Sequence, residues 1–167
     1  MRSFLFLSLM SFFCVYIPAG AQTTATATFT ASVTVIEPIS ITTVSHMNFA
    51  SLDAGMGGEI ILTPQNTRTT KGDVRLAEET NVSAAAFIVN GDKGHSYSIT
   101  LPQEGFILSN GSQNIRIKDF TSDIGRSAVL TKGSSEIRVG ATLEIDPQQI
   151  PGNYRSIGSI PITVNYN

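Results

Sequence analysis

Two histidines are the side chains best suited to metal or acid–base chemistry, and they stand far apart in the chain. His46 and His95 show no HExxH or paired-ligand spacing, so a zinc site would need mostly carboxylate ligands. Asp119 and Asp123 lie close together around Phe120 and could help to hold calcium in a loop, but the ligand spacing of an EF-hand is missing. The sequence therefore predicts no metal site and no cofactor.

The carboxylates and the partial nucleophile motif do not form the combination of residues that a catalytic site needs. Glu144 and Asp146 fall on one solvated face of an expected strand, whereas a retaining glycosidase needs two carboxyl groups about 5 Å apart across a cleft. The fragment around His95, Gly-His-Ser, is not a complete hydrolase elbow. Residues 55–58 precede no Lys-Ser or Lys-Thr, so they are expected to form a turn and not a phosphate loop. Catalysis is not expected.

The N-terminus has the pattern of an export signal. A positive start is followed by an apolar run over residues 4–17, and Ala19 and Ala21 supply the small residues that signal peptidase requires. The pattern predicts a signal peptide over residues 1–21 and a mature chain that begins at Gln22. Cys14, the one cysteine, lies in the leader, so the mature domain must be held by its core without a disulfide.

Charge and hydropathy limit the partners. The chain carries 11 basic and 13 acidic residues, a net charge of −2, which does not favour nucleic acid as a partner. No segment after the leader approaches about 18 continuous apolar residues, so no integral membrane span is expected once the leader is removed. We expect an exported protein of the periplasm, the cell surface (a fimbrium) or the extracellular space.

Residues 24–35 alternate small polar and apolar side chains without a break. This period of two predicts an extended strand of roughly 36 Å with one face suited to a core. It is either an ordinary first strand or a strand that can be donated to another subunit. The chain is accordingly divided into the leader (1–21), an N-terminal arm or first strand (22–36) and a β-sandwich domain (37–167). The candidate donor-strand residues are Ala27, Phe29, Ala31, Val33 and Val35.

The body reads as many short strands with frequent turns. Alternation is clearest over residues 137–145, and shorter runs occur near 39–41, 60–62, 87–89, 97–101 and 115–117. Asn90-Gly91 and Asn110-Gly111 are typical of tight hairpins, in which the glycine takes a positive φ. Residues 64–79 are expected to form a long loop or a ragged hairpin. The fold class is therefore all-β, an antiparallel sandwich or barrel.

Alternation continues to the C-terminus. Ile160, Ile162, Val164 and Tyr166 fall on one face of a last strand, and Pro161 places part of that strand at an edge or a bulge. Nothing follows that could pair beside this strand, so the domain could lack its closing strand and leave an apolar groove open. These four residues are the candidate wall of an acceptor groove.

Together these features resemble an uncharacterised family of small secreted pilin-like domains of Gram-negative bacteria, and more distantly the chaperone–usher pilins. The matching stretches are residues 38–42, 101–102, 139–143 and 158–167, together with the leader and the threonine-rich arm. The resemblance implies an antiparallel immunoglobulin-like (pilin-like) β-sandwich that lacks one strand, which the N-terminal arm of the next subunit completes. It also implies like or related subunits, a periplasmic chaperone and an outer-membrane usher as partners.

We therefore expect a secreted structural or adhesive surface subunit that assembles by donating its N-terminal strand. The alternative is a self-contained, noncatalytic extracellular module that binds a glycan or a peptide. In that case the same strands would close the domain on itself, and the loops near residues 55–58 and 92–95 would hold the ligand.

Overall fold

The computed structural model describes residues 24–78 and 81–167, and the chain divides into two units, residues 1–34 and 35–167. In the first unit, residues 24–34 are exposed and form no strand. The residues of the predicted cleavage site, Ala19, Ala21 and Gln22, lie outside the described residues. All the strands belong to the second unit, and the described part of the chain contains no helix.

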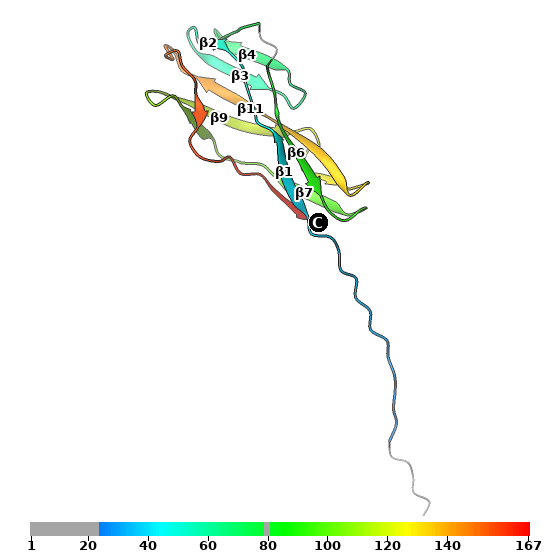
Figure 1. Ribbon diagram of the computed structural model, residues 1–167. Coiled ribbons are helices and arrows are strands. Elements are labelled where there is room, and N and C mark those ends of the chain that lie inside the picture. Colours follow the sequence, from blue (N-terminus) through cyan, green and yellow to red (C-terminus); the bar gives the residue numbers. More distant parts are fainter. Residues whose placement is uncertain (1–23, 79–80) are drawn as a thin grey trace, which may run out of the picture. The chain divides into compact units, whose positions relative to one another are not determined.

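The body is an all-β antiparallel sandwich. Its strands are β1 (Ser40–Ser45), β2 (Leu52–Asp53), β3 (Gly58–Leu62), β4 (Arg68–Gly72), β5 (Arg75–Leu76), β6 (Ala85–Asn90), β7 (Ser96–Thr100), β8 (Phe106–Ser109), β9 (Asn114–Ser122), β10 (Ser127–Val129), β11 (Ser134–Ile145), β12 (Arg155–Ser156) and β13 (Thr163–Tyr166). The larger sheet has the order β1-β6-β11-β9-β8-β12; in addition, β3 pairs with β11, and β4 pairs with β3 (Figure 1). A second sheet has the order β10-β7-β13, and β2 pairs with β5.

β11 is the central strand, and its inward face is the one that the alternation predicts. One of its edges pairs with β9, while its other edge pairs first with β6 and then with β3. Ile137 and Val139 belong to one core cluster, and Ala141, Leu143 and Ile145 to the other. The twelve residues of β11 therefore run through both halves of the core.

The C-terminal strand covers fewer residues than the alternation of exposed and covered side chains. Exposed and covered residues alternate from Ser159 to Tyr166, as predicted, but ladder pairing with β7 begins only at Thr163. Pro161 has no N–H to donate, so the chain before Thr163 keeps the alternation without joining the sheet.

The two Asn-Gly pairs differ. Gly111 has φ 89° in the hairpin between β8 and β9, as expected. Gly91 does not take a positive φ, because β6 and β7 belong to different sheets and no hairpin joins them. Gly91 is needed for space, since a Cβ there would overlap the hydroxyl of Tyr166. The segment 64–78, expected to be a long loop or a ragged hairpin, contains β4, which forms a hairpin with the preceding β3, and β5, which pairs with β2.

Candidate functional site: an apolar groove with an unpaired edge

A groove of about 1340 Å³ opens in the body between two segments that carry little regular structure. Residues 46–55 line one side, and residues 148–156, 158–160 and 162 line the other. Its apolar lining includes four side chains that belong to the core, Ile115 and Ile117 from β9 and Val139 and Leu143 from β11. An extended chain that entered this groove would therefore lie directly on the core.

Residues 158–162 form an unpaired edge of the groove. The N–H of Ile157 donates to the carbonyl of Ile107 at 3.0 Å, and pairing resumes at Thr163. Between these points, the main chain makes no hydrogen bond with any other part of the chain that the structure describes. Ile160 and Ile162 are half-buried and line the groove. The segment thus combines inward apolar side chains with free main-chain donors and acceptors.

Residues 46–55, on the opposite side of the groove, are fixed by hydrogen bonds from other segments of the body. Asn48 and Ser83 exchange main-chain hydrogen bonds of 2.7 and 3.0 Å. The guanidinium of Arg68 donates to the carbonyls of Phe49, at 2.6 Å, and of Ala77, at 3.0 Å. Charge-assisted hydrogen bonds of this kind fix a loop without a strand partner. This side of the groove is therefore shaped before any ligand arrives.

The loop that precedes the unpaired edge is fixed by side-chain hydrogen bonds. The Tyr154 hydroxyl donates to the Ile150 carbonyl at 2.8 Å and accepts from Nε2 of Gln149 at 3.0 Å. The Ile150 N–H donates to Oε1 of Gln113 at 2.8 Å. These contacts position residues 148–154, and they could not be read from local patterns in the sequence.

The structure divides the predicted acceptor wall into two pairs. Ile160 and Ile162 line the groove. Val164 and Tyr166 lie in β13, pair with β7 and pack on the core cluster that contains Tyr97. Only the first pair is brought together with the other groove residues.

The predicted donor-strand residues have no apolar cover in the described chain. Ala27, Phe29, Ala31, Val33 and Val35 are all exposed, with Phe29 91% and Val33 88% accessible. Their apolar surface is therefore not covered by the described chain.

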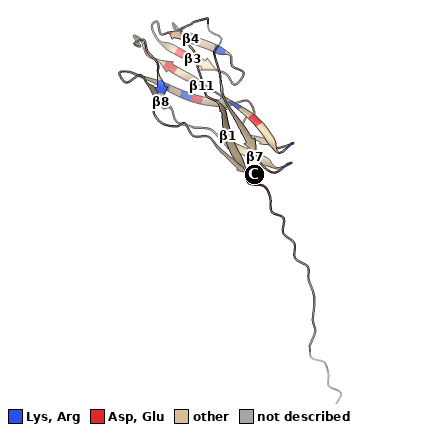
Figure 2. Cartoon of the chain, in the orientation of Figure 1, with Lys and Arg blue, Asp and Glu red and all other residues tan. Residues whose placement is uncertain are grey.

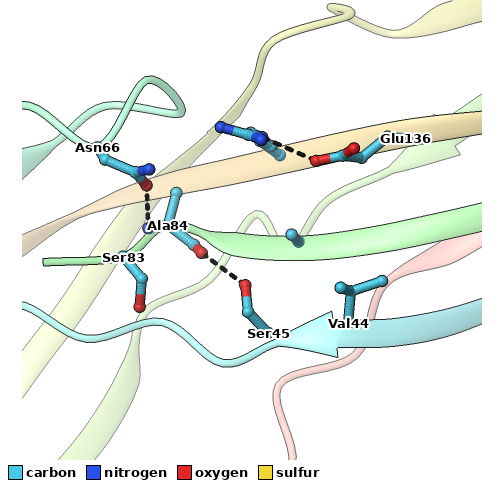
Figure 3. Close-up of a pocket in the computed structure, with 8 residues that line it drawn as sticks. Val44, Ser45, Asn66, Ser83, Ala84 and Glu136 are labelled. Atoms are coloured by element: carbon cyan, nitrogen blue, oxygen red, sulfur yellow. Dashed lines mark hydrogen bonds and ion pairs between the residues drawn. The ribbon is translucent and has the colours of Figure 1, made fainter. Parts of the chain in front are cut away.

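A smaller pocket of about 180 Å³ opens between β1, β6 and β11 (Figure 3). Oδ1 of Asn66 accepts from the Ala84 N–H at 2.7 Å, and the Ser45 hydroxyl donates to the Ala84 carbonyl at 3.3 Å. Nε of Arg138 donates to Oε1 of Glu136 at 2.9 Å. Ligand sites usually measure about 300–1,000 Å³. This pocket is smaller, and its polar groups already bind one another.

The charged side chains of the larger sheet form an ion-pair network. Figure 2 shows acidic and basic positions along the strands of this sheet. Nζ of Lys118 lies 3.0 Å from Glu59 and 3.6 Å from Glu144, and Nζ of Lys71 lies 3.5 Å from Glu59. The hydrogen bond from Lys118, together with its charge, lowers the pKa of Glu59, and the same hydrogen bond raises the pKa of Lys118. Glu144 is therefore held by a lysine.

The other candidate chemical groups are separated. His46 lines the groove, whereas Nδ1 of His95 lies 3.2 Å from Asp92. Within residues 24–78 and 81–167, no three His, Cys, Asp or Glu side chains are grouped so that they could hold a metal ion. No helix in these residues is long and apolar enough to cross a membrane.

Comparison with known proteins gives one match. A family model described as a domain of unknown function (DUF4402) covers residues 39–166, which include every strand of the body. No curated protein and no solved structure matches the chain.

Proposed function

The chain belongs to the DUF4402 family, a domain of unknown function, and on the basis of its groove and its arm we propose that it is an exported, pilin-like structural or adhesive surface subunit. In this proposal it assembles by inserting its N-terminal arm into the groove of a neighbouring subunit. The observation that carries the proposal is the unpaired edge at residues 158–162, which borders a groove lined in part by core side chains.

Addition of a strand would use both features of this edge, its free main chain and the groove beside it. An added strand gains affinity from main-chain hydrogen bonds and specificity from alternate side chains that enter pockets. The free main chain of residues 158–162 supplies the first, and the groove over Ile117 and Leu143 supplies the second. Pro161 lacks a donor, so pairing there depends on its neighbours.

The arm has the matching pattern. Its apolar residues occur at every second position, so they can all face the groove while the threonines face water. Phe29 is the one large side chain among residues 25–31, and it is the residue that we expect to contribute most to binding. The exposed arm and the open groove offer complementary apolar surfaces.

The proposal involves no catalysis and no cofactor. Assembly would take place after export, with like or related subunits as partners and with a periplasmic chaperone and an outer-membrane usher as the route. The second candidate, a noncatalytic binding module, is supported by the size of the groove, which would also accept an extended peptide from an unrelated protein.

Two substitutions at adjacent positions test the proposal. The measurement is the affinity of synthetic peptides of residues 24–36 for the purified chain. Phe29→Asp places an unpaired carboxylate in an apolar groove, at a cost of several kcal/mol, so binding should fall by more than about a hundredfold. Thr28→Asp changes the opposite face of the same strand and should alter the affinity only a few-fold.

The same pair of substitutions in the full chain should change assembly in parallel. We expect the parent and Thr28→Asp to form complexes between subunits, measured by light scattering after size-exclusion chromatography, and Phe29→Asp to remain monomeric. Equal behaviour of the two variants would show that the arm does not bind through one apolar face. Failure of the parent chain to bind either the peptide or a second copy would favour the binding module.

A further inference from the structure

The hydroxyl of Tyr166 joins three segments that are distant in sequence. It donates to the carbonyl of Glu37 at 2.7 Å and accepts from the N–H of Asp92 at 2.6 Å. Glu37 precedes β1, Asp92 lies between β6 and β7, and Tyr166 ends β13. One hydroxyl can donate once and accept from a neighbour, and here it does both.

Residues in the segment 91–95 pack closely around the Tyr166 side chain. The ring of His95 meets the ring of Tyr166 edge-on, with 5.6 Å between their centres, and Nδ1 of His95 lies 3.2 Å from Oδ2 of Asp92. At Gly91 any larger residue would overlap the Tyr166 hydroxyl. The turn before β7 is therefore built around this one oxygen atom.

Glu37 and Pro38 form the point at which the arm joins the body. Pro38 has a fixed φ, and the carbonyl of the preceding residue is held by Tyr166. The groove is bordered by residues 46–55, which follow the C-terminal end of β1, whereas Glu37 precedes its N-terminal end. Because Thr43 and Ser45 of β1 also line the groove, insertion of the arm into the groove of its own body would require a reversal of the chain between the arm and β1.

Such a reversal would compete with assembly. The thirteen residues 24–36 span about 43 Å when extended, enough to reach back along a small domain. A tethered segment has an effective concentration in the millimolar range, so an unrestrained arm would occupy its own groove before that of a neighbour. A donor-strand subunit therefore needs a feature that disfavours self-insertion.

We propose that the Tyr166 hydroxyl is a clasp that fixes the Glu37–Pro38 junction and so directs the arm to a second copy of this chain instead of to its own groove. This inference rests on the proposed function, because it assigns the regulation of the same groove. Tyr166 acts here as a positioning residue, because it does not itself line the groove.

Tyr166→Phe tests the clasp because it removes the hydroxyl and keeps the ring. Tyr97→Phe is the matched control: Tyr97 is the cross-strand partner of Tyr166, and its hydroxyl has no hydrogen-bond partner in the described chain. Amide hydrogen exchange at Asp92 reports the clasp directly. We expect exchange about tenfold faster in Tyr166→Phe and unchanged exchange in Tyr97→Phe.

Competition by the chain's own arm is measured with the peptide of residues 24–36 and the full purified chain. Released from the clasp, the arm should compete for its own groove, so the apparent affinity of Tyr166→Phe for the peptide should fall about tenfold. Adding Phe29→Asp to the same chain disables the competing arm and should restore the parent affinity. Gly91→Ala, which displaces the hydroxyl without altering Tyr166, should reproduce the loss.

The outcomes separate the two proposals. Peptide binding that is the same in the parent and in Tyr166→Phe overturns the clasp and leaves the proposed function standing. An equal loss in Tyr97→Phe, or a loss that Phe29→Asp does not restore, also overturns the clasp. Absence of peptide binding by the parent chain overturns the proposed function, and the clasp with it.

Discussion

Removing the hydroxyl of Tyr97 should stabilise the protein. Tyr97 is fully buried in β7, and no hydrogen-bond partner for its hydroxyl exists among the described residues. A buried polar group without a partner costs about 1–3 kcal/mol of desolvation. Tyr97→Phe removes that cost, keeps the ring, and leaves a space of one oxygen atom, so we expect a net gain of about 1 kcal/mol.

Urea denaturation, followed by circular dichroism, measures this gain. The midpoint should rise with an unchanged m-value, and Tm should rise by about 2–4 °C for a domain of this size. Tyr154→Phe is the control, because that hydroxyl makes two hydrogen bonds, and its removal should destabilise the protein by about 1 kcal/mol. A loss of about 1 kcal/mol or more in Tyr97→Phe would refute the reasoning, since it would show that the hydroxyl is hydrogen-bonded, for instance to an ordered water.

Two further predictions concern β11 and its neighbours. Gly140→Ala should destabilise the body by about 1–3 kcal/mol or more, measured by thermal unfolding, because its Cβ would overlap the Leu62 carbonyl and lie 2.8 Å from the carbonyl carbon of Thr63; a Tm equal to that of the parent would contradict this packing. Lys118→Met should lower stability at pH 7, because Glu59 and Glu144, which are directly opposite in the ladder, lose the cation between them. The lowered pKa of Glu59 means that its contribution is present above the ordinary value of 4.5 and is lost as the pH falls through the lowered pKa. The deficit of Lys118→Met in urea denaturation should therefore shrink from pH 7 to pH 3, and an equal deficit at both values would show that the lysine acts through packing.

Local pattern predicted the strands with the clearest alternation in the body, but it was wrong for residues 24–34, which form no strand because no other strand of the described chain pairs with them, and for the beginning of the last strand. The alternation over residues 137–145 predicts the inward face of β11, because period two is a property of the strand itself. The same pattern over residues 160–166 predicts the inward side chains but not the sheet, since pairing starts only at Thr163 after Pro161. A side-chain pattern records which face is covered and does not record whether the main chain has a partner.

The groove could be anticipated only in part. Ile160 and Ile162 are on its predicted wall, but its opposite side, residues 46–55, was not predicted. That side is positioned by Arg68, and the loop at residues 148–154 by Gln113, through hydrogen bonds between distant segments. Such contacts have no period in the sequence, because each depends on two segments that only the folded topology brings together. Gly91 is a similar case: its role depends on Tyr166, at the other end of the domain.

β11 also determines how the body unfolds. Because one edge of this strand pairs with β6 and then with β3, both core clusters rest on a single continuous stretch of main chain. Loss of either cluster frees half of β11, and the ladder with β9, which extends from Val139 to Glu144 across both halves, loses its support. We therefore expect the two halves to unfold together, in one cooperative transition that circular dichroism and calorimetry would both report.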